Sequence, residues 1–345
     1  MDFKILREFP SPDLERQWRD YLSRVEFPSH YDAPEFFLEP VWPGKQCFAV
    51  LALGNNRISG VLTGLHVGKH VMCGMSSRPQ ISVERQGDTE AILETLAQGL
   101  LVEAASAELV SVYTWPSLRL LPFSAHGFQC HELPGGNVVL DLTLGADALF
   151  KQFTKDRRRN IRFAEKNGVE VSEAATAQDV AGAYTVYCAW RETGRKTVRG
   201  DKLSFEVFEK ASRLKANRRL FVARVSGKVV AINVFRFCPG GLFESSSNSS
   251  LDEFIHLKPN DLLQWRGIEW ACNHGLRRHS LGGSHQFLLR FGGTVVPVLH
   301  YRLDRTWLRR HDLRDKVREV SLRIVRKLPP WVEKGLRKLA GKEEA

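Results

Sequence analysis

The sequence predicts a mixed α/β protein of two tandem mixed-sheet domains, followed by a C-terminal basic helical tail. Strand-like and helix-like patterns alternate along the 345 residues, which favours an α/β architecture. One order of elements, an antiparallel meander followed by a helix and a further strand, occurs twice. With 43% hydrophobic and 26% charged residues the chain has an ordinary globular composition, and its length allows two domains.

The first copy begins with apolar strand patterns separated by short turns. We expect strands at Cys47–Leu53, Arg57–Val67 and His70–Cys73, divided by turns that contain Gly. A long helix should follow at Thr89–Ala107, because apolar residues recur there at helical spacing. The short apolar run Leu109–Thr114 then predicts a buried strand that returns parallel into the sheet.

The second copy repeats this order at an offset of about 170 residues, which is hard to obtain by chance. Its meander strands are expected at Leu220–Val225, Lys228–Phe237 and Leu242–Ser247. A helix at Asn260–Asn273 and a strand at Arg277–Leu281 complete it. The two copies therefore predict one repeated unit with its own sheet and crossover helix.

The predicted domains cover residues 1–143 and 144–304, and a basic tail covers 305–345. The net charge of +11 is unevenly spread, since the tail holds 13 Lys and Arg against 6 Asp and Glu. Apolar residues recur at helical spacing in the tail, and Trp331 follows a Pro-Pro pair. A basic amphipathic helix with an interfacial Trp can lie on anionic lipid, and the alternative is a helix packed across the second domain.

A second basic block, residues 151–168, holds seven Lys and Arg against two acidic residues. Predicted as one helix, it places Lys151, Lys155, Arg158 and Arg162 in one stripe and apolar side chains on another face. Because guanidinium groups match phosphate oxygens bidentately, the stripe predicts a phosphate or diphosphate substrate. The alternative is a solvated helix face.

The cysteine content and the hydropathy of the sequence indicate the cellular compartment of the protein. The six cysteines show neither paired nor metal-ligand spacing, so we expect free thiols, a reducing cytoplasm and no metal site. No run of about 18 apolar residues occurs, and the N-terminus lacks the apolar core of a signal peptide, so no membrane span is expected. The expected location is cytoplasmic, with the tail as the candidate for peripheral contact with the inner face of a membrane.

The order of meander, helix and parallel strand is that of the GNAT acetyltransferase fold, and several motifs add a family resemblance. Residues 158–169 resemble the "RxxIRxAxxxGV" signature of FemAB-like proteins, and residues 258–265 resemble their "PxxLLxW" helix start. Residues 281–284 and 287–293 resemble their closing "GGs…FKxxFGG", and residues 327–331 resemble the end of polysaccharide-associated members. The first half resembles them only in the order of its elements.

This resemblance implies two GNAT-like domains with an active cleft between them, which transfer an acyl or aminoacyl group to an amine or hydroxyl of an envelope precursor. It also implies that Arg158 and Arg162, with Lys155 one turn away, contact substrate phosphate. The Lys of the family's closing motif falls on Leu288 here, with Arg290 nearby. In aminoacyl-tRNA-dependent members that Lys stabilises charge at the reacting carbonyl, so its loss makes tRNA a less favoured partner.

The donor that the GNAT resemblance implies is acyl-CoA, and the acceptor is a cell-envelope glycan or peptidoglycan precursor that could be lipid-linked. A diphosphate-binding loop is only fragmentary in the sequence, at residues 85–87 before the long helix. The alternatives are an aminoacyl-tRNA-dependent ligase and a non-catalytic accessory protein of polysaccharide biosynthesis. DNA is not an expected partner, because helix-turn-helix, zinc-finger and RNA-binding strand motifs are absent from the sequence.

Acyl transfer needs a base and donors for the developing oxyanion. We predict Glu244 as the base, His256 as a proton shuttle and Arg290 as a catalytic cation. The alternative for Glu244 and His256 is plain exposure on a strand and a loop. Ser246 and Asn248 are predicted to bind sugar hydroxyls, with a position in a turn as the alternative.

The end of the last predicted strand is rich in glycine. Gly282, Gly283 and Ser284 could let a ligand approach backbone N–H groups that hold an oxyanion, and a tight turn is the alternative. Arg191 ends a predicted helix and could reach the substrate, whereas Trp190 beside it is expected in the core. Because the motifs lie in or next to the second copy, we expect the chemistry there and a structural role for the first.

Overall fold

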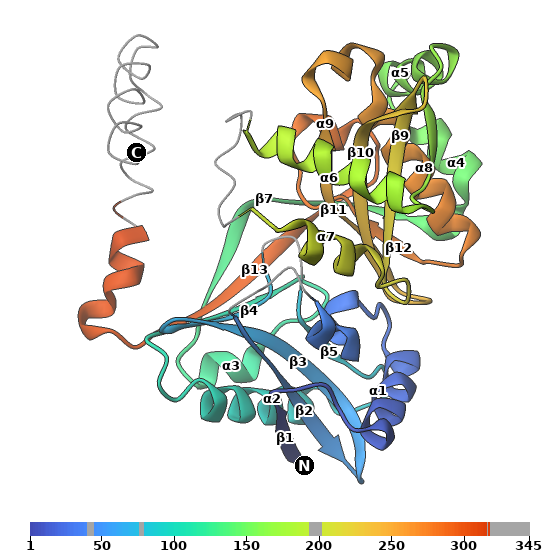
Figure 1. The fold of residues 1–345 in the computed structure, drawn as a ribbon. Helices are drawn as coiled ribbons and strands as arrows, with labels where there is room; N and C mark the ends of the chain where they lie inside the picture. Colours follow the sequence, from blue (N-terminus) through green and yellow to red (C-terminus); the bar gives the residue numbers. More distant parts are fainter. Residues whose placement is uncertain (40–44, 76–78, 193–201, 316, 318–345) are drawn as a thin grey trace.

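In the part of the chain that the structure describes, thirteen strands form one continuous sheet that runs through both copies (Figure 1). The computed structural model describes residues 1–39, 45–75, 79–192, 202–315 and 317. Along the sheet the strand order is β1-β2-β3-β4-β6-β13-β7-β12-β11-β10-β9-β8, with β5 paired to β3. Helices cover this sheet in two groups, one for each copy.

The first copy is a meander packed on one long helix. Its strands are β1 (Asp2–Leu6), β2 (Gln46–Gly54), β3 (Arg57–Val67), β4 (His70–Cys73), β5 (Ile81–Val83) and β6 (Leu109–Thr114). Its helices are α1 (Pro12–Arg24), η1 (His30–Asp32), η2 (Pro34–Leu38), α2 (Thr89–Glu103) and α3 (Leu121–Ala125). The Asp88 side chain accepts a hydrogen bond from the Ala91 N–H and caps the start of α2. Because β4 and β6 pair in parallel, α2 is the crossover between them.

The second copy repeats this arrangement with α8 as the crossover between the parallel strands β11 and β12. Its strands are β8 (Glu170–Glu173), β9 (Arg218–Val225), β10 (Lys228–Phe237), β11 (Leu242–Ser250) and β12 (Arg278–Ser280). Its helices are η3 (Leu142–Leu144), α4 (Ala146–Gln152), α5 (Lys155–Lys166), α6 (Ala177–Glu192), α7 (Phe205–Ser212), η4 (Asp252–Leu257), α8 (Pro259–Asn273) and α9 (Gln286–Leu289). The short η5 (Trp307–Arg309) begins the tail.

Two long strands, β7 (Gln129–Asp141) and β13 (Thr294–Asp304), join the copies. They pair with each other, while β7 also pairs with β12 and β13 also pairs with β6. Leu299 of β13 therefore lies in the core of the first copy, and Leu140 of β7 lies in the core of the second. Residues 294–304, which we expected in the C-terminal domain, thus complete the sheet of the N-terminal one.

The α/β class, the two GNAT-like copies and their parallel strand pairs are confirmed. The prediction of one helix over residues 151–168 is wrong, because the chain breaks into α4 and α5. Phe153 has an extended backbone, and the Thr154 hydroxyl accepts a hydrogen bond from the Arg157 N–H at 3.3 Å, which starts a new helix. The expected helix at Thr89–Ala107 ends early, since α2 stops at Glu103.

Only the first part of the basic tail lies within the described residues. Trp307, Leu308 and Leu313 are exposed there. Most of the tail, including Trp331, lies outside the described residues, so its contact with a membrane stays a prediction. In the described part of the chain, none of the helices has the length and apolar character to cross a bilayer. The same residues contain no cluster of His, Cys, Asp and Glu suited to a metal ion.

Candidate functional site

A polar cavity of about 530 Å³ opens where the parallel strands β11 and β12 separate. The two strands pair only over residues 242–244 and 278–280. Beyond this point β11 stays with β10, whereas Leu281 and Gly283 form backbone hydrogen bonds with Val138 of β7. The separated strand edges leave room for a ligand, which is the usual place for a binding site in a sheet that contains parallel strands.

Serine and amide side chains dominate the walls of this cavity. Strand β11 contributes a run of serines and Asn248, and α8 contributes Asn260 and Gln264. The loop after β12 contributes Gly282, whose φ of +81° is a left-handed conformation that favours glycine. The other wall residues include Trp190, Asp252, Ile255, Leu281, His285, Phe287 and Leu288.

A chain of hydrogen bonds runs from the core to this cavity. The Gln264 amide nitrogen lies 2.7 Å from His279 Nε2, and the Asn233 amide donates to the Gln264 oxygen at 3.1 Å. The Ser245 hydroxyl lines the cavity and donates to the Asn233 oxygen at 3.1 Å. His279 Nδ1 lies 3.0 Å from the Phe243 carbonyl oxygen, which can only accept, so Nδ1 carries the proton and Nε2 accepts.

This chain places neutral groups beneath the cavity. Burial lowers the pKa of His279 to about 3, so its ring is neutral at pH 7. Because the Ser245 hydroxyl donates its hydrogen to Asn233 in the core, the Ser245 oxygen can still accept a hydrogen bond from a ligand. The side chains beneath the cavity are therefore polar and uncharged, and their hydrogen bonds fix their orientation.

Two further buried acceptors face the same cavity. Asn248 Oδ1 and Asn260 Oδ1 have no hydrogen-bond partner among the described residues. Asn260 uses its amide nitrogen to donate to Ser250 Oγ at 3.0 Å. A buried acceptor without a partner costs about 1–3 kcal/mol, so a ligand that brings N–H donors would be stabilised here.

Comparison with known proteins assigns this region to a family. Residues 151–291 match the family model described as acetyltransferase (GNAT) domain, and this stretch contains every residue of the cavity wall. The solved structure of FemX has a TM-score of 0.66 and 13% sequence identity, and the match covers 88% of this chain and 98% of FemX. Residues 151–291 therefore form a GNAT acetyltransferase domain, and the chain as a whole shares the FemAB-like fold of FemX.

Two further solved structures share this FemAB-like GNAT fold. L-PGS from Bacillus licheniformis has a TM-score of 0.56 at 13% identity, with 87% of this chain and 93% of that chain covered. A tandem GNAT protein from the clavulanic acid biosynthesis pathway has a TM-score of 0.54 at 13% identity, with 89% and 99% covered. No curated protein matches the sequence. These likenesses show that the fold extends over both copies.

Three of the predicted substrate-binding residues line the cavity: Ser246, Asn248 and Gly282. Ser246 and Asn248 belong to β11, so the alternative of a turn is wrong for both. The Ser246 hydroxyl donates to a carbonyl of β10 at 2.9 Å. Gly283 and Ser284 follow Gly282 in the chain, but the Gly283 carbonyl bonds to β7 and neither residue forms part of the cavity wall.

The three predicted catalytic residues lie outside the cavity wall. Glu244 is buried in β11, opposite β10, so the alternative of an exposed strand residue is wrong. His256 is exposed on η4, and Arg290 is exposed at the end of α9. Among the described residues, the acidic and imidazole side chains of the wall are those of Asp252 and His285.

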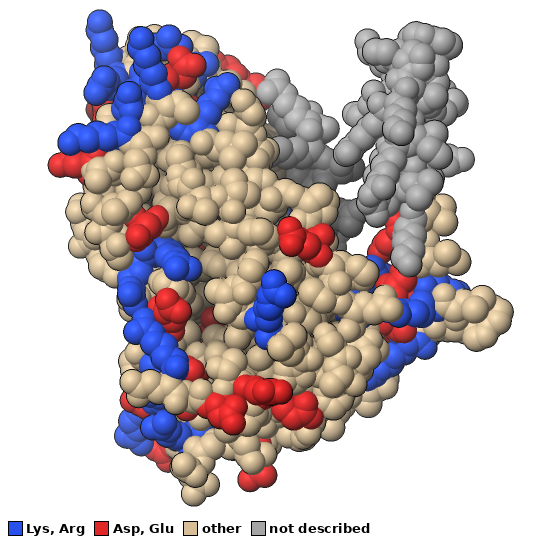
Figure 2. Space-filling view, turned by 180° about the vertical axis from the view of Figure 1, so that it is seen from behind, with Lys and Arg blue, Asp and Glu red and all other residues tan. Residues whose placement is uncertain are grey.

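Three members of the predicted cationic stripe lie on the outer surface of α5, where Figure 2 shows Lys and Arg side chains gathered, whereas Lys151 belongs to α4. Lys155 and Arg162 are exposed there. Arg158 instead donates hydrogen bonds to the carbonyl oxygens of Lys151 and Phe153, at 2.7 and 2.6 Å, and so satisfies the end of α4. None of these side chains lines the cavity. Their contact with substrate phosphate stays a prediction, for a ligand that extends beyond the cavity.

Sequence reasoning missed Arg157, the arginine of this block that points inward. It pairs with Asp261 at the start of α8 and donates to the Phe287 carbonyl at 2.6 Å. Its guanidinium carbon lies 4.1 and 4.2 Å from the ring centroids of Phe287 and Phe291, and burial lowers its pKa. Arg157 therefore holds α9, and with it the Phe287 part of the cavity wall, against α8.

The start of α8 is a poor place for a diphosphate. Pro259 occupies its first position and has no N–H. The Lys258 N–H already bonds to the Ile255 carbonyl oxygen of η4, and the Asp261 N–H bonds to that of Lys258. The Asp261 carboxylate also stands in the first turn, where an anion would otherwise bind. This agrees with the missing glycine-rich loop in the sequence.

The outer wall of the cavity is apolar. Leu288 is buried there, so a hydrocarbon side chain stands where the family motif has Lys. Trp190, which we expected in the core, is half-buried and lines the cavity. Arg191 lies with its guanidinium carbon 6.0 Å from the Tyr187 ring centroid and forms no part of the wall.

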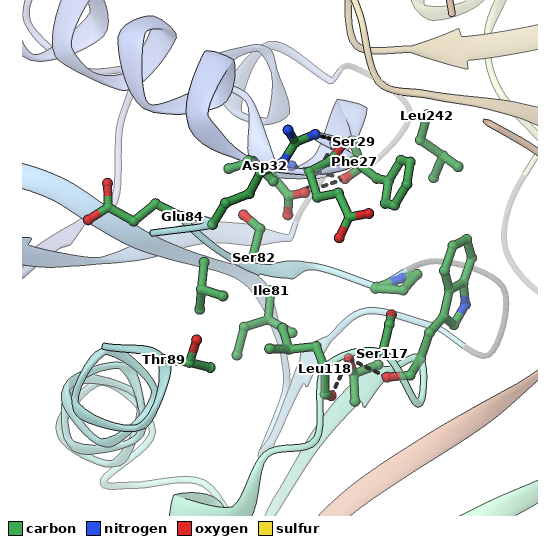
Figure 3. Close-up of a pocket in the computed structure, with 17 residues that line it drawn as sticks. Phe27, Ser29, Asp32, Ile81, Ser82, Glu84, Thr89, Ser117, Leu118 and Leu242 are labelled. Atoms are coloured by element: carbon green, nitrogen blue, oxygen red, sulfur yellow. Dashed lines mark hydrogen bonds between the residues drawn. The ribbon is translucent and has the colours of Figure 1, made fainter. Parts of the chain in front are cut away.

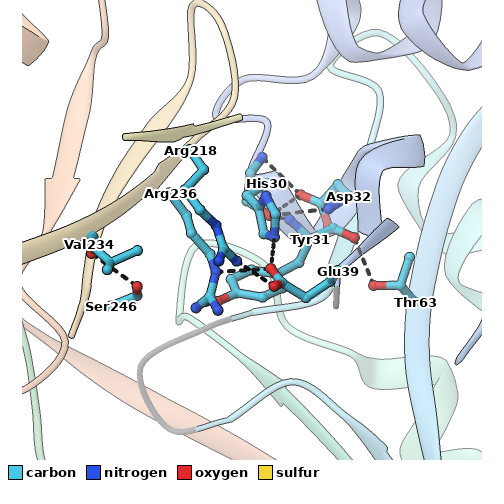
Figure 4. A network of polar contacts seen from close by, with 10 residues as sticks. His30, Tyr31, Asp32, Glu39, Thr63, Arg218, Val234, Arg236 and Ser246 are labelled. Atoms are coloured by element: carbon cyan, nitrogen blue, oxygen red, sulfur yellow. Dashed lines mark hydrogen bonds and ion pairs between the residues drawn. The ribbon is translucent and has the colours of Figure 1, made fainter. Parts of the chain in front are cut away.

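A buried ionic network fastens the first copy to the second (Figure 4). Glu39, next to η2, pairs with Arg218 of β9 and, at 3.1 Å, with Arg236 of β10. His30 Nε2 lies 3.2 Å from Glu39, and burial lowers the His30 pKa to about 4. Arg236 also donates to the Tyr31 hydroxyl at 3.2 Å. Because its members come from both copies, the network fixes their relative position.

Proposed function

We propose that this chain is an acyltransferase that holds its donor between β11 and β12 and transfers the acyl group to an amine or hydroxyl of a cell-envelope glycan or peptidoglycan precursor. The separation of the parallel strands over the polar cavity, within the GNAT-matching residues, carries the proposal. Acyl-CoA is the proposed donor. Its pantetheine arm is extended and contains two amides, which suits an open strand edge and the acceptors of Asn248 and Asn260.

The proton of the attacking amine or hydroxyl needs an acceptor at the cavity. We assign this role to His285, which lines the cavity, because a neutral imidazole can accept a proton near pH 7. Glu244 and His256 were the candidates from sequence, and both lie outside the cavity wall. Oxyanion stabilisation by backbone N–H groups near Gly282 stays part of the proposal.

The test measures thiol release from acetyl-CoA and longer acyl-CoAs in the presence of UDP-amino sugars. His285→Ala should lower turnover by about 10²–10⁴-fold, the usual worth of a general base. His256→Ala is the matched control on the neighbouring η4 and should stay within about twofold of wild type. A large loss in His256→Ala with none in His285→Ala would contradict the assignment of the base. The absence of turnover with every acyl-CoA would reject the donor.

The start of α8 favours one second candidate, an aminoacyl-tRNA-dependent ligase. An aminoacyl ester brings no diphosphate to the helix start, where Pro259 and Asp261 disfavour one. Against it, Leu288 provides no charge for the reacting carbonyl. Transfer of a labelled aminoacyl group from aminoacyl-tRNA to the same acceptors, with release of the tRNA hydroxyl and raised by Leu288→Lys, would support the ligase. Turnover with acyl-CoA alone would exclude it.

The acceptor in this proposal could be linked to lipid, and the basic tail over residues 305–345 would then bring the chain to a membrane. Trp307 and Leu308 are exposed at the start of this tail, beside several cations. Co-sedimentation with vesicles that contain anionic lipid, compared with neutral vesicles, tests this contact. Equal recovery with both kinds of vesicle would reject it.

A further inference from the structure

The first copy holds a cavity of about 480 Å³ that the proposed acyl transfer does not use (Figure 3). It lies between the loop after α1, strand β5 and the loop after β6, and Leu242 of β11 also contributes to its wall. None of its residues lines the cavity between β11 and β12. Its volume lies in the range of small-molecule sites.

A buried carboxyl group, that of Asp32 in η1, lines this cavity and is 3% exposed. Its Oδ2 accepts hydrogen bonds from the Ser29 N–H at 3.1 Å and the Ser29 hydroxyl at 2.9 Å. Its Oδ1 is buried and has no partner among the described residues. Burial raises the pKa of Asp32 to about 7, and only the Ser29 hydrogen bonds act against this rise. The carboxyl therefore lacks the partner that a buried charge needs.

A buried donor in the same wall also lacks a partner. Trp115 follows β6 directly, and its side chain lines the cavity at 7% exposure. Its Nε1–H finds no acceptor within the described part of the chain. Buried tryptophan N–H groups usually have an acceptor, so this one points to a ligand atom. The cavity thus presents one acceptor and one donor that the fold itself leaves unsatisfied.

The charges around the cavity favour a cationic ligand. Among the residues that the structure describes, Glu26, Asp32 and Glu84 line it together with one cation, Arg85. Glu84 already pairs with Arg24 at 3.0 Å. Arg85 is exposed at the rim and donates to the Glu26 carbonyl oxygen at 3.3 Å. Glu26 is exposed, so Asp32 is the buried carboxyl group that stays available inside the cavity.

We propose that this cavity binds a small molecule with a primary amino group, whose ammonium donates to Asp32 Oδ1 and whose second polar group accepts from Trp115 Nε1–H. Ammonium is the donor that gains most, because charge-assisted hydrogen bonds are about twice as strong as neutral ones. The rings of Phe27 and Trp115 in the wall suit the hydrocarbon part of such a ligand. The first copy then has a ligand of its own, in place of the purely structural role that the sequence suggested.

Calorimetric titration of the full chain with matched ligand pairs tests this site. Benzylamine and glucosamine should each bind about tenfold more tightly than benzyl alcohol and N-acetylglucosamine, which lack the ammonium. Asp32→Asn is nearly isosteric and keeps an acceptor for Ser29, so the chain should fold and lose the preference for amines. Equal affinity for amines and neutral ligands, or a preference that survives in Asp32→Asn, would overturn the proposal.

Two further variants fix the location of the site. Asp20→Asn removes an exposed carboxylate of α1 that does not line the cavity, and it should leave amine binding unchanged. Ser117→Trp places a large side chain at the rim of the cavity. Because Ser117 is exposed, this variant should still fold, and it should abolish amine binding. It therefore tests the location even if Asp32→Asn proves unstable. Amine binding that persists in Ser117→Trp would place the ligand elsewhere and overturn the proposal.

Discussion

The substitution Glu39→Gln removes the carboxylate that two buried arginines share. The Glu39 side chain is 0% exposed, and those of Arg218 and Arg236 are 4% and 7% exposed. After the substitution, two guanidinium groups would remain in a buried interface with a neutral amide between them. Water cannot solvate them there, so the folded state carries the full cost.

The size of this cost follows from the geometry. Removal of one partner from a buried ion pair lowers the free energy of unfolding by about 3–5 kcal/mol. Glu244 lies opposite Arg236 in the β10–β11 pair and offsets part of its charge, so we expect the lower end of this range. Because the network joins the two copies, the substitution should also loosen the coupling between them.

Urea unfolding followed by circular dichroism measures both effects. We expect one cooperative transition in the wild type and, in Glu39→Gln, an earlier midpoint with a broader or divided transition. Glu15→Gln is the matched control, because its partner Arg19 is 49% exposed and the loss should stay under about 1 kcal/mol. An equally small loss in both variants would refute the reasoning that the network fastens the copies together.

Three further predictions concern the second copy. Arg157→Lys loses the planar stack and the guanidinium fork that bonds both Asp261 and the Phe287 carbonyl oxygen, and it should lower the free energy of unfolding by about 2 kcal/mol in urea titrations. Arg159→Lys on the exposed face should change it by less than about 0.5 kcal/mol. The lowered pKa of His279 means that the unfolded chain binds a proton below pH 6.5 while the folded chain does not. The stability advantage of wild type over His279→Gln should therefore shrink by about 1.4 kcal/mol per pH unit as pH falls from 6.5 to 5, and a constant difference would contradict burial of a neutral ring. Asn248→Ala should weaken donor binding in calorimetry by about tenfold, while an unchanged affinity would remove Asn248 from the site.

The meander of each copy could be predicted because its strands carry local signals. Apolar runs gave Lys228–Phe237, which lies between turns that contain Gly, and Leu109–Thr114 with their observed bounds. The long strand β7 contains Pro134, Gly135 and Gly136, which read as a turn. The strand continues past them because β13 pairs with β7 on both sides, over residues 129–133 and 137–139. The skipped residues form a bulge, a tertiary arrangement that local pattern does not contain.

The site could be predicted only where one segment supplies it. Ser246 and Asn248 lie on a single polar strand end, so their common location was visible in the sequence. Asn233, Gln264 and His279 lie on three elements and meet only when β10, α8 and β12 pack together. Each looks like an ordinary polar residue in its own segment, and the partners that define its role are distant in the chain.

Hydrogen–deuterium exchange of the full chain with and without donor tests the central claim most directly. If the acyl donor lies between β11 and β12, acetyl-CoA or a longer acyl-CoA should slow exchange in residues 245–248 and 281–288. Residues 81–83 and 114–118, around the cavity of the first copy, should exchange at their original rates. Protection confined to the first copy, or no protection with any acyl-CoA or aminoacyl-tRNA, would contradict the assignment of the acyl donor to the second copy.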